Sequence, residues 1–502
     1  MTARTPALTI EIDRHKPLPI YLQICERFRT AIAAGHLRPG DRVPALRGLA
    51  TQLNTARGTV ELAYTILVDE GYLQMRGAAG TFVSPSLPAA VMRPARRQGR
   101  RGSGGDGGQD ATQAAPIGRP APRPLAVAMA LSGEPRPLQP GLPALDAFPR
   151  KLWNRLIARR ARTADRTMLA YPSPVGYRPL REHIATYLGL SRGVTCLPEQ
   201  VFITGGYRAT LELVLRSLAS ATDRVWFEDP GYLLARGFLA ETGVRLVPVP
   251  IDEEGIDVAR GTALDADARF ALVTPSHQSP LGCTLSLARR MALLDWAEKG
   301  ARWIVEDDYD SEFRYVGRPL PALKSLDEHD RVIYCGTFSK VMFPGLRLAY
   351  AVVPERAVER VERVACSMNA GSPVLTQAAL ADFIEQGHFA RHIKRMRALY
   401  GQRRMLLAHA LERAFGDRLV VQLPPGGIQA AVCFTEGADG PVDDVAVAAR
   451  ARDAGLAVLP LSIWYASGRL RRTPRGLVMG FANIADATEA NRLARTLRAC
   501  LQ

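Results

Sequence analysis

The chain has 502 residues, 47% of them hydrophobic and 23% charged, with a formal net charge of +16. That length allows more than one domain, while the lack of any run of about 18 apolar residues argues against a membrane span and seven scattered cysteines argue against a disulfide framework. The positive charge favours a polyanionic partner such as nucleic acid, with a merely solvated basic surface as the alternative.

The N-terminal part predicts three helices followed by a small hairpin. It lacks the apolar core of a secretion signal, so we expect a cytoplasmic protein. In "PIYLQICERFRTAIAAGHL", Tyr21, Ile24, Phe28 and Ile32 recur at helical spacing and form one apolar stripe. "ALRGLATQLN" and "ARGTVELAYTILVDEGYL" predict two more helices, and "YLQMRGAAGTFVSP" predicts two short strands around a turn. This order is typical of a winged helix-turn-helix.

These residues resemble the DNA-binding head of GntR-type regulators. The resemblance rests on the patterns Arg-x-Leu-Ala, Arg-x-Thr-Val, Glu-Gly-Tyr-Leu and Gly-x-x-Gly-Thr-Phe-Val. It implies that the third helix enters the major groove with its N-terminal end leading, which places Arg57 and Thr59 near bases or phosphates and Arg47 on the preceding helix. The wing, from Arg76 to Gly80, is expected at the backbone or minor groove. The expected partner is double-stranded operator DNA.

Two positions depart from the head's family pattern. Ala45 and Ala56 stand where the family usually has Ser, directly before the second helix and before the recognition-helix arginine. Each loses a side-chain N-cap, which typically costs about 1 kcal/mol. Neither change removes a base-reading group, so we still predict DNA binding, from a head of lower stability.

Residues 93–124 are rich in Gly, Pro and Arg and have few large apolar residues. Such a segment buries too little surface to offset the entropy of ordering it, so it predicts a flexible linker. We therefore divide the chain into a winged helix-turn-helix domain at 1–84, a basic linker at 85–125 and a body at 126–502. The linker arginines are a secondary candidate for phosphate contacts.

The body alternates helical patterns with apolar runs, among them "RVWFEDP", "FALVTPS", "RWIVEDDYD", "RVIYCGTFSK" and "LRLAYAVVP". Near-continuous apolar strands between helices indicate a mostly parallel sheet covered on both faces. Polar residues follow the strand ends, where folds of this class bind their ligands.

Some of these polar groups match what pyridoxal 5′-phosphate requires of a protein: an amine, an anion cradle, a carboxylate and a donor for its phenolic oxygen. Lys340 offers the amine. The backbone N–H groups of Gly206 and Tyr207, at a predicted helix start, offer the cradle. Thr337 and Arg347 flank the lysine and can bind phosphate through a hydroxyl and a charged fork.

Three further residues complete the set. Asp307 ends a strand, and a carboxylate beside the pyridine nitrogen keeps that nitrogen protonated. Tyr309 follows two positions later, and Tyr232 stands after a Pro-Gly turn where its ring could stack on the cofactor. Each residue alone is also explained by an ordinary turn or a solvated surface. Their order along one α/β chain favours a cofactor site.

From about residue 126 the body resembles a fold-type I, class I aminotransferase. "TPSHQSPLG", "EDDYDSEFRYVGRPLPALKSLD" and "GTFSKVMFPGLRLAY" resemble the MocR/GabR regulators, which fuse a GntR-type head to such a body. The resemblance implies an α/β pyridoxal-phosphate-dependent transferase fold with a small α+β C-terminal subdomain. It also implies that Lys340 forms the internal aldimine, Asp307 pairs with the pyridine nitrogen, Tyr309 contacts the phenolic oxygen, and Thr337 and Arg347 hold the phosphate.

The body departs from the aminotransferase pattern at three points. Ser279 stands where an Asn commonly bonds the phenolic oxygen, and His277 and Gln278 are candidate substitutes. Arg208 replaces a Gln at the phosphate turn, and whether it binds the anion or points away is open. Val478 aligns with the Arg that clamps the substrate carboxylate in true aminotransferases. An alternative carboxylate partner, or an ordinary basic loop, lies just upstream at Arg469, Arg471, Arg472 and Arg475.

The sequence therefore predicts a transcriptional regulator whose body senses pyridoxal 5′-phosphate, an amine or an amino acid at Lys340. The alternatives are an active aminotransferase with an accessory head, and a DNA-binding protein whose body is only a dimerisation scaffold. The family resemblance implies a homodimer, with heads that can swap across it, and an operator with two half-sites. We expect no metal site, and weak or half transamination stays open.

Overall fold

The structure is a computed structural model of the full chain. It describes residues 12–14, 19–77, 80–85, 132–316, 320–368, 371–435, 441–466 and 473–501. The chain divides into two compact units, Met1–Ala126 and Val127–Gln502. The predicted linker at 85–125 lies outside the described residues beyond Pro85, so its boundaries and role stay predictions. No helix within the described ranges is long and apolar enough to cross a membrane.

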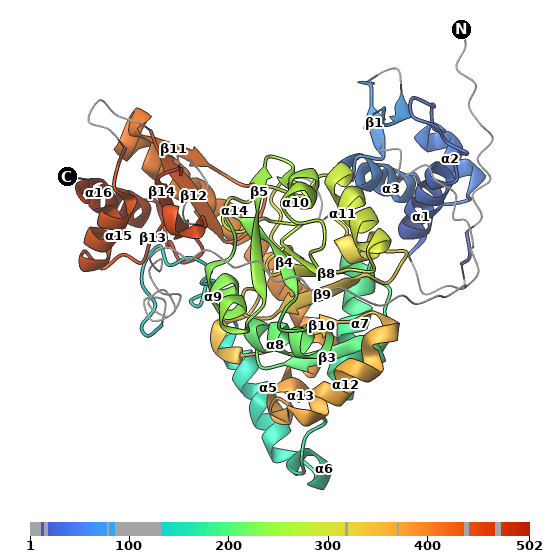
Figure 1. The fold of residues 1–502 in the computed structure, drawn as a ribbon, viewed down its shortest axis with the longest axis horizontal. Coiled ribbons are helices and arrows are strands. Elements are labelled where there is room, and N and C mark those ends of the chain that lie inside the picture. Colours follow the sequence, from blue (N-terminus) through green and yellow to red (C-terminus); the bar gives the residue numbers. More distant parts are fainter. Residues whose placement is uncertain are drawn as a thin grey trace, which may run out of the picture. The chain divides into compact units, whose positions relative to one another are not determined.

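The first unit contains three helices followed by a two-stranded antiparallel ribbon, in the predicted order (Figure 1). Its core forms because Ile24, Phe28 and Ile32 lie on one face of the first helix and are fully buried. The Tyr64 ring packs edge-on against Phe28, with 5.4 Å between ring centroids. The elements are α1 (Ile20–Ala33), α2 (Leu46–Gln52), α3 (Arg57–Asp69), β1 (Leu73–Met75) and β2 (Thr81–Val83).

The starts of α2 and α3 confirm the expected loss of side-chain caps. Their N-cap residues are Ala45 and Ala56, and neither helix has a side-chain hydrogen bond at its cap. Several body helices begin instead with an Asp or Ser whose side chain accepts a hydrogen bond from the first turn, as capping requires. These caps are Asp257, Ser286, Asp443 and Asp486.

The second unit is built around an eight-stranded sheet in the order β3-β10-β9-β8-β7-β4-β5-β6. The pairs β9/β8, β8/β7, β7/β4 and β4/β5 are parallel, whereas β10 is antiparallel to both β3 and β9. The predicted mostly parallel sheet is confirmed. The strands are β3 (Val201–Thr204), β4 (Arg224–Asp229), β5 (Arg245–Asp252), β6 (Gly255–Ile256), β7 (Phe270–Val273), β8 (Trp303–Asp308), β9 (Val332–Thr337) and β10 (Ala349–Val352).

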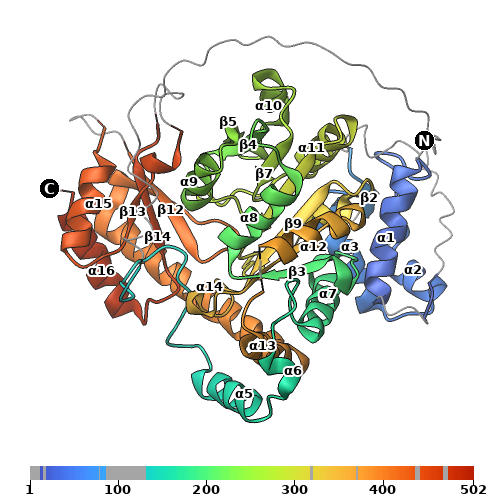
Figure 2. The ribbon, with the colours of Figure 1, turned by 60° about the horizontal axis from the view of Figure 1, so that its bottom comes forward.

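Helices cover both faces of this sheet (Figures 1 and 2). Phe227 packs with α8, α9 and α12, while its neighbour Trp226 packs with α10 and α11 on the other face, because successive strand side chains point in opposite directions. Near β3 and β10 that second face is covered by α5, α7, α13 and α14. The helices are α5 (Arg150–Arg162), α6 (Arg166–Leu169), α7 (Arg178–Arg192), α8 (Tyr207–Leu218), α9 (Leu233–Glu241), α10 (Val258–Leu264), α11 (Leu287–Lys299), α12 (Val358–Ser367), α13 (Val374–Glu385) and α14 (His388–Phe415).

The C-terminal part forms a smaller α+β layer, as expected. Its antiparallel sheet has the order β11-β12-β14-β13, and β14 is buried along its whole length. Helix α14 contributes apolar side chains to the same core, which joins this layer to the large sheet. The elements are β11 (Leu419–Gln422), β12 (Gln429–Phe434), α15 (Asp444–Asp453), β13 (Leu459–Pro460), β14 (Gly476–Gly480) and α16 (Ala487–Ala499).

Candidate functional site

The amine of Lys340 lies just after the end of β9 and contacts a distant loop. Its Nζ donates a hydrogen bond of 2.8 Å to the carbonyl oxygen of Gly141, in the segment before α5. Gly141 has a φ of +67°, which favours glycine, and a β-carbon there would lie 2.5 Å from Lys340 Nζ, so a larger residue would displace the amine. Burial lowers the pKa of Lys340, with Asp310 and Asp307 opposing the shift. A lowered pKa increases the neutral, nucleophilic fraction of the amine.

An anion-binding corner forms where β3 leads into α8. Gly206 is the N-cap residue of α8, with a φ of +113°, and no side chain caps the helix. A β-carbon at Gly206 would lie 2.7 Å from Arg347 Nη2, so the guanidinium lies directly over the helix start. Arg347 itself adopts left-handed backbone angles, φ 51° and ψ 44°, a strain typical of functional sites. Backbone N–H groups and a fixed cation therefore converge at one point.

Thr337 lies on the same edge of the sheet as this corner. It ends β9 opposite Ala349 of β10, and Ala349 in turn pairs with Thr204 at the end of β3. The Thr337 hydroxyl accepts a hydrogen bond of 3.2 Å from the Ser339 N–H, which fixes its direction. The predicted phosphate residues thus come from strand ends that are neighbours in the sheet.

Asp307 is a buried carboxylate, 4% exposed, near the end of β8. Burial raises its pKa well above the ordinary value, and the nearby Tyr207 side chain opposes that rise. In the described part of the chain no cationic side chain forms an ion pair with it, although buried carboxylates normally have such a partner. The ring of Tyr232 lies 6.3 Å from that of Tyr207. A buried carboxylate that interacts with two tyrosines is suited to a flat ligand with a protonated ring nitrogen.

Tyr309 is held by the segment that contains the unusual Ser279. Its hydroxyl lies 3.0 Å from His277 Nδ1. Burial raises the pKa of Tyr309, and a hydrogen bond with Ser279 opposes the rise. Gln278 is turned away, because its Nε2 donates to Pro230 O at 2.8 Å and to Glu228 Oε2 at 3.2 Å. Of the two candidate substitutes for the missing Asn, only His277 reaches Tyr309.

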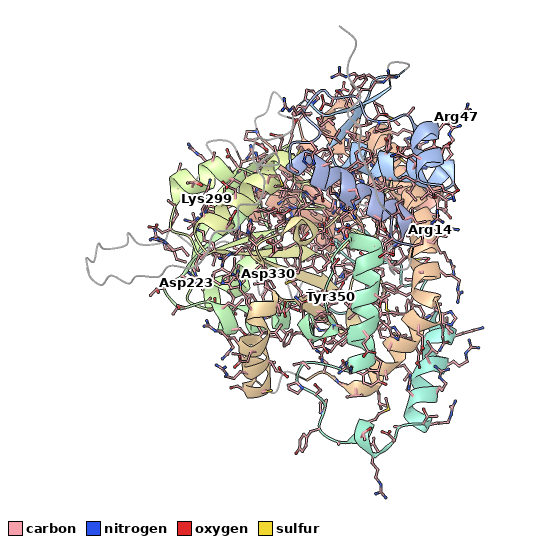
Figure 3. All side chains as sticks on the ribbon, turned by 90° about the vertical axis from the view of Figure 1, so that its right-hand side faces the viewer. Arg14, Arg47, Asp223, Lys299, Asp330 and Tyr350 are labelled. Atoms are coloured by element: carbon pink, nitrogen blue, oxygen red, sulfur yellow. The ribbon has the colours of Figure 1, made fainter. Side chains whose placement is uncertain are left out.

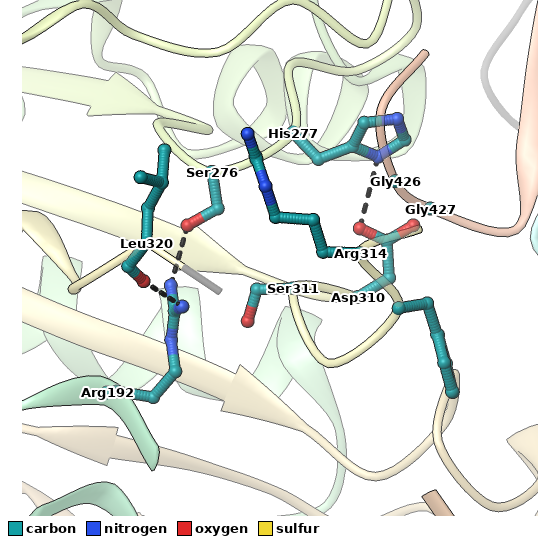
Figure 4. Close-up of a pocket in the computed structure, with 10 residues that line it drawn as sticks. Arg192, Ser276, His277, Asp310, Ser311, Arg314, Leu320, Gly426 and Gly427 are labelled. Carbon is teal, nitrogen blue, oxygen red and sulfur yellow. Dashed lines mark hydrogen bonds and ion pairs between the residues drawn. The ribbon is translucent and has the colours of Figure 1, made fainter. Parts of the chain in front are cut away.

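A small polar pocket is lined in part by His277 (Figure 4). Arg192, which is buried, lines the pocket too and donates to Ser276 Oγ and to Leu320 O. His277 and Ser311 each have one buried polar atom, Nε2 and Oγ, without a hydrogen-bond partner among the described residues. The pocket is lined by Arg192, Ser276, His277, Asp310, Ser311, Phe313, Arg314, Leu320, Gly426 and Gly427.

The structure also places Arg208 and Val478, two residues that depart from the aminotransferase pattern. Arg208 points away from the anion corner, since its guanidinium pairs with exposed Glu241 at 3.0 Å and stacks on the Phe238 ring. Val478 is fully buried in an apolar cluster against which Tyr232 packs.

One residue of the upstream basic loop, Arg475, forms an ion pair of 3.3 Å with buried Asp444. The other three arginines predicted there lie outside the described residues: Arg469, Arg471 and Arg472.

The head exposes the residues predicted to contact DNA. Arg47 projects outward from α2 (Figure 3). Arg57 is exposed at the first position of α3. Thr59, in the first turn of α3, is half-buried. Exposed Arg76 stacks on the Phe82 ring of the wing, 5.0 Å from its centroid. Gly80, with a φ of +105°, completes the turn, since its carbonyl accepts the Arg76 N–H.

Sequence reasoning missed two residues. Gly141 is separated from Lys340 by 199 positions, and its signal was the turn-rich stretch "QPGLPALDAFP". Arg42 is exposed and lies within 3.1 Å of a β-carbon built at Gly80, which adds a basic group beside the wing. Neither contact follows from local spacing.

Comparison with known proteins identifies both units. Residues 20–83 match the family of bacterial regulatory proteins, gntR family, and residues 145–477 match aminotransferase class I and II. The probable rhizopine catabolism regulatory protein MocR of Rhizobium meliloti is 36% identical over 478 residues, 95% of this chain and 93% of that protein. The HTH-type pyridoxine biosynthesis transcriptional regulator PdxR of Corynebacterium glutamicum is 36% identical over 492 residues, 96% of each chain.

The body also resembles solved aminotransferases. Pyrococcus horikoshii kynurenine aminotransferase, in complex with PMP, has a TM-score of 0.66 and 26% identity, covering 75% of this chain and 93% of that one. LysN, the α-aminoadipate aminotransferase of Thermus thermophilus, complexed with N-(5′-phosphopyridoxyl)-L-leucine, has a TM-score of 0.65 and 27% identity, covering 75% and 96%. The predicted fold class is confirmed. The chain belongs to the MocR-type transcriptional regulators, which join a GntR-family DNA-binding head to an aminotransferase-like body.

Proposed function

We propose that this regulator binds pyridoxal 5′-phosphate at Lys340 and changes its affinity for operator DNA when an amine, an amino acid or the cofactor itself binds. The observation that carries the proposal is Asp307. It is a buried carboxylate without a cationic side-chain partner in the described chain, on the sheet edge that also presents Lys340 and the Gly206–Arg347 corner. A pyridinium nitrogen is the cation that this position lacks.

In this proposal the phosphate is bound by the N–H groups of Gly206 and Tyr207, the Arg347 guanidinium and the Thr337 hydroxyl. The site is preorganised, since Arg347 already lies over the α8 start and Thr337 already has a fixed hydroxyl. A guanidinium group and a helix N-terminus each favour binding of a dianion such as phosphate.

The ring of the cofactor is proposed to lie between Asp307 and Tyr232, with Tyr309 and Ser279 at its phenolic oxygen. Bound pyridoxal 5′-phosphate supplies an aldehyde carbon that exchanges amines, which is the chemistry an amine sensor needs. The burial that lowers the pKa of Lys340 increases the neutral fraction of its amine, which favours that exchange. Asp307 holds the proton on the ring nitrogen.

Val478 favours sensing over turnover. It occupies the position aligned with the carboxylate-clamping arginine and is fully buried among apolar residues, so it offers no positive charge to an α-carboxylate. An active aminotransferase remains the second candidate, because the cofactor set around Lys340 is complete. Steady turnover of an amino acid with an oxo-acid by purified protein would favour that candidate.

Arg47, Arg57 and Thr59 are proposed to read an operator half-site in the major groove, with Arg76 and Gly80 placing the wing on the backbone or minor groove. Exposure of these arginines supports the proposal. Because operator DNA lies inside the cell, we propose that the regulator acts in the cytoplasm.

A homodimer is proposed to match two operator half-sites. It is supported by two apolar side chains near α6 that are exposed in the single chain, Leu169 at 72% and Tyr171 at 98%. Two exposed apolar side chains so close in the chain can form part of a contiguous apolar patch, the kind of surface that marks a protein–protein interface. Sedimentation analysis should give a dimer for the native chain and a monomer for the double variant Leu169→Ser/Tyr171→Ser. A native monomer would contradict the dimer.

Borohydride reduction tests the cofactor assignment directly. Purified protein is incubated with pyridoxal 5′-phosphate, reduced and digested, and mass spectrometry locates the pyridoxyl group. We expect the group on Lys340. A group found mainly on another lysine, or on none, would overturn the proposal.

A further inference from the structure

His277 makes its two side-chain contacts through one ring atom. Nδ1 lies 3.0 Å from the Tyr309 hydroxyl and 3.1 Å from Asp310 Oδ1. An ionised carboxylate only accepts hydrogen bonds, so the arrangement that satisfies both neighbours has the proton on Nδ1. Nδ1–H then points at acceptors on Asp310 and Tyr309, and the Tyr309 O–H is left to donate elsewhere.

The ring cannot easily turn away from this arrangement. A β-carbon at Gly427 would lie 2.0 Å from His277 Cε1, and one at Gly282 would lie 2.9 Å from His277 Nε2, so two glycines with positive φ pack against the imidazole. Asp310 is fixed in turn, because its Oδ2 accepts a hydrogen bond from the Ile428 N–H at 3.3 Å. Neighbouring residues that hold a side chain in this way fix its orientation, as residues around a metal site fix the orientation of the metal ligands.

His277 is one of the residues that line the polar pocket of Figure 4. Its Nε2 is buried without a hydrogen-bond partner among the described residues, and so is the hydroxyl of Ser311, which lines the same pocket. With the proton on Nδ1, Nε2 carries a lone pair and is an acceptor.

We propose that His277 is a positioning residue that aims the Tyr309 hydroxyl at the phenolic oxygen of the bound cofactor. This inference rests on the proposed binding of pyridoxal 5′-phosphate at Lys340. Ser279 also bonds Tyr309, but a serine hydroxyl turns freely and can donate or accept. The imidazole of His277 cannot turn freely in this way. His277 therefore decides the direction of the Tyr309 O–H bond.

Two amide substitutions separate the roles of the two ring nitrogens. In His277→Asn the amide nitrogen can occupy the place of Nδ1, and in His277→Gln it can occupy the place of Nε2. The readout is the pH at which the visible absorbance of protein-bound pyridoxal 5′-phosphate changes. A donor on the charged phenolic oxygen favours the deprotonated form and keeps this midpoint low.

We expect His277→Gln and His277→Ala to raise the midpoint by about one pH unit, the effect of losing about one hydrogen bond, and His277→Asn to stay near the wild type. In a Tyr309→Phe background, His277→Ala should add no further shift, because the two residues act in series. Thermal unfolding of the cofactor-free variants tests whether each is folded.

Equal midpoints in the wild type and all three His277 variants would overturn this inference alone, as would a full shift from His277→Ala in the Tyr309→Phe background. If His277→Ala does not fold, the Asn and Gln pair decides between the same outcomes. A wild-type protein with no visible band would overturn the proposed cofactor binding, and this inference with it.

Discussion

Lys340 donates a hydrogen bond of 2.8 Å to the carbonyl oxygen of Gly141, a residue 199 positions earlier in the chain. The bond holds the amine of the strand-end lysine against the loop that precedes α5. Burial also lowers the pKa of Lys340, which increases the neutral fraction of the amine. The fold thus both places this amine and makes it more nucleophilic.

Gly206 should be indispensable for the phosphate corner. In Gly206→Ala the new methyl group would lie 2.7 Å from Arg347 Nη2, at a φ of +113°, so we expect affinity for pyridoxal 5′-phosphate to fall by about 10- to 100-fold. Fluorescence or absorbance titration measures the change.

Gly243→Ala is the matched control for that substitution. Gly243 also has a positive φ, 85°, but nothing lies within 4 Å of a β-carbon built there. The control should lose stability and keep its cofactor affinity. Equal cofactor losses in both variants would mean that backbone strain, and not the Arg347 contact, explains the result.

Arg57→Ala should weaken binding to the specific operator by about 5- to 150-fold, the range for one base contact, while leaving cofactor absorbance unchanged. The exposed Arg27 of α1 serves as the control, and Arg27→Ala should bind DNA almost as the wild type does. Gel-shift titration at fixed salt measures both. Loss of DNA binding together with the absorbance band would mean that the two functions are assigned to the wrong units.

Ala56→Ser should stabilise the head. The N-cap of α3 has no side-chain hydrogen bond, and a serine there supplies an acceptor for the first turn, worth about 1 kcal/mol. For a unit of this size, that free energy raises the midpoint of head unfolding by about 4–8 °C, measurable by calorimetry. Ala34→Ser at the C-cap of α1 should give no such gain. An unchanged midpoint in Ala56→Ser would contradict the cap argument.

Glu228 should make cofactor-free protein less stable as pH rises. Burial raises its folded-state pKa from 4.5 to about 7, against opposing hydrogen bonds from Thr274 and Gln278. Between these two values the folded state binds more protons than the unfolded state, so the free energy of unfolding falls as pH increases. Glu228→Gln, which mimics the protonated acid, should reduce this slope in denaturant titrations between pH 4.5 and pH 7.

Exposed Glu359 provides the comparison for that pH series, and Glu359→Gln should keep the wild-type slope. A Glu228→Gln slope equal to that of the wild type would show that the carboxyl is ionised in the folded protein throughout this range.

Local sequence patterns were enough to predict the main helices and strands of both units. The stripe of Ile24, Phe28 and Ile32 fixes α1 because helical spacing brings these side chains to one face, which is buried in the structure. The apolar runs before Asp307 and Lys340 form neighbouring parallel strands, so residues at their ends meet at one edge. The order of apolar runs and polar residues along the chain was therefore enough to predict that Asp307 and Lys340 lie at the same edge of the sheet.

Contacts between distant segments could not be predicted from spacing. The direction of the Arg208 side chain depends on Glu241 and Phe238, which α9 brings beside α8 only in the folded chain. The choice of His277 over Gln278 depends on Glu228 and the Pro230 carbonyl, which take up the Gln278 amide. The direction of each of these side chains is decided by residues from distant parts of the chain, so the local sequence does not predict it.

The most direct test of the account is a titration of purified protein with pyridoxal 5′-phosphate and a panel of amines and amino acids, reading visible absorbance and operator affinity together. The wild type should gain a band with the cofactor, and one class of amine should change both the band and the DNA affinity, the latter by about 5- to 150-fold. Lys340→Ala should bind DNA without either response, and Lys299→Ala, at an exposed ion pair on α11, should behave as the wild type. A Lys340→Ala protein that keeps both responses would contradict the account.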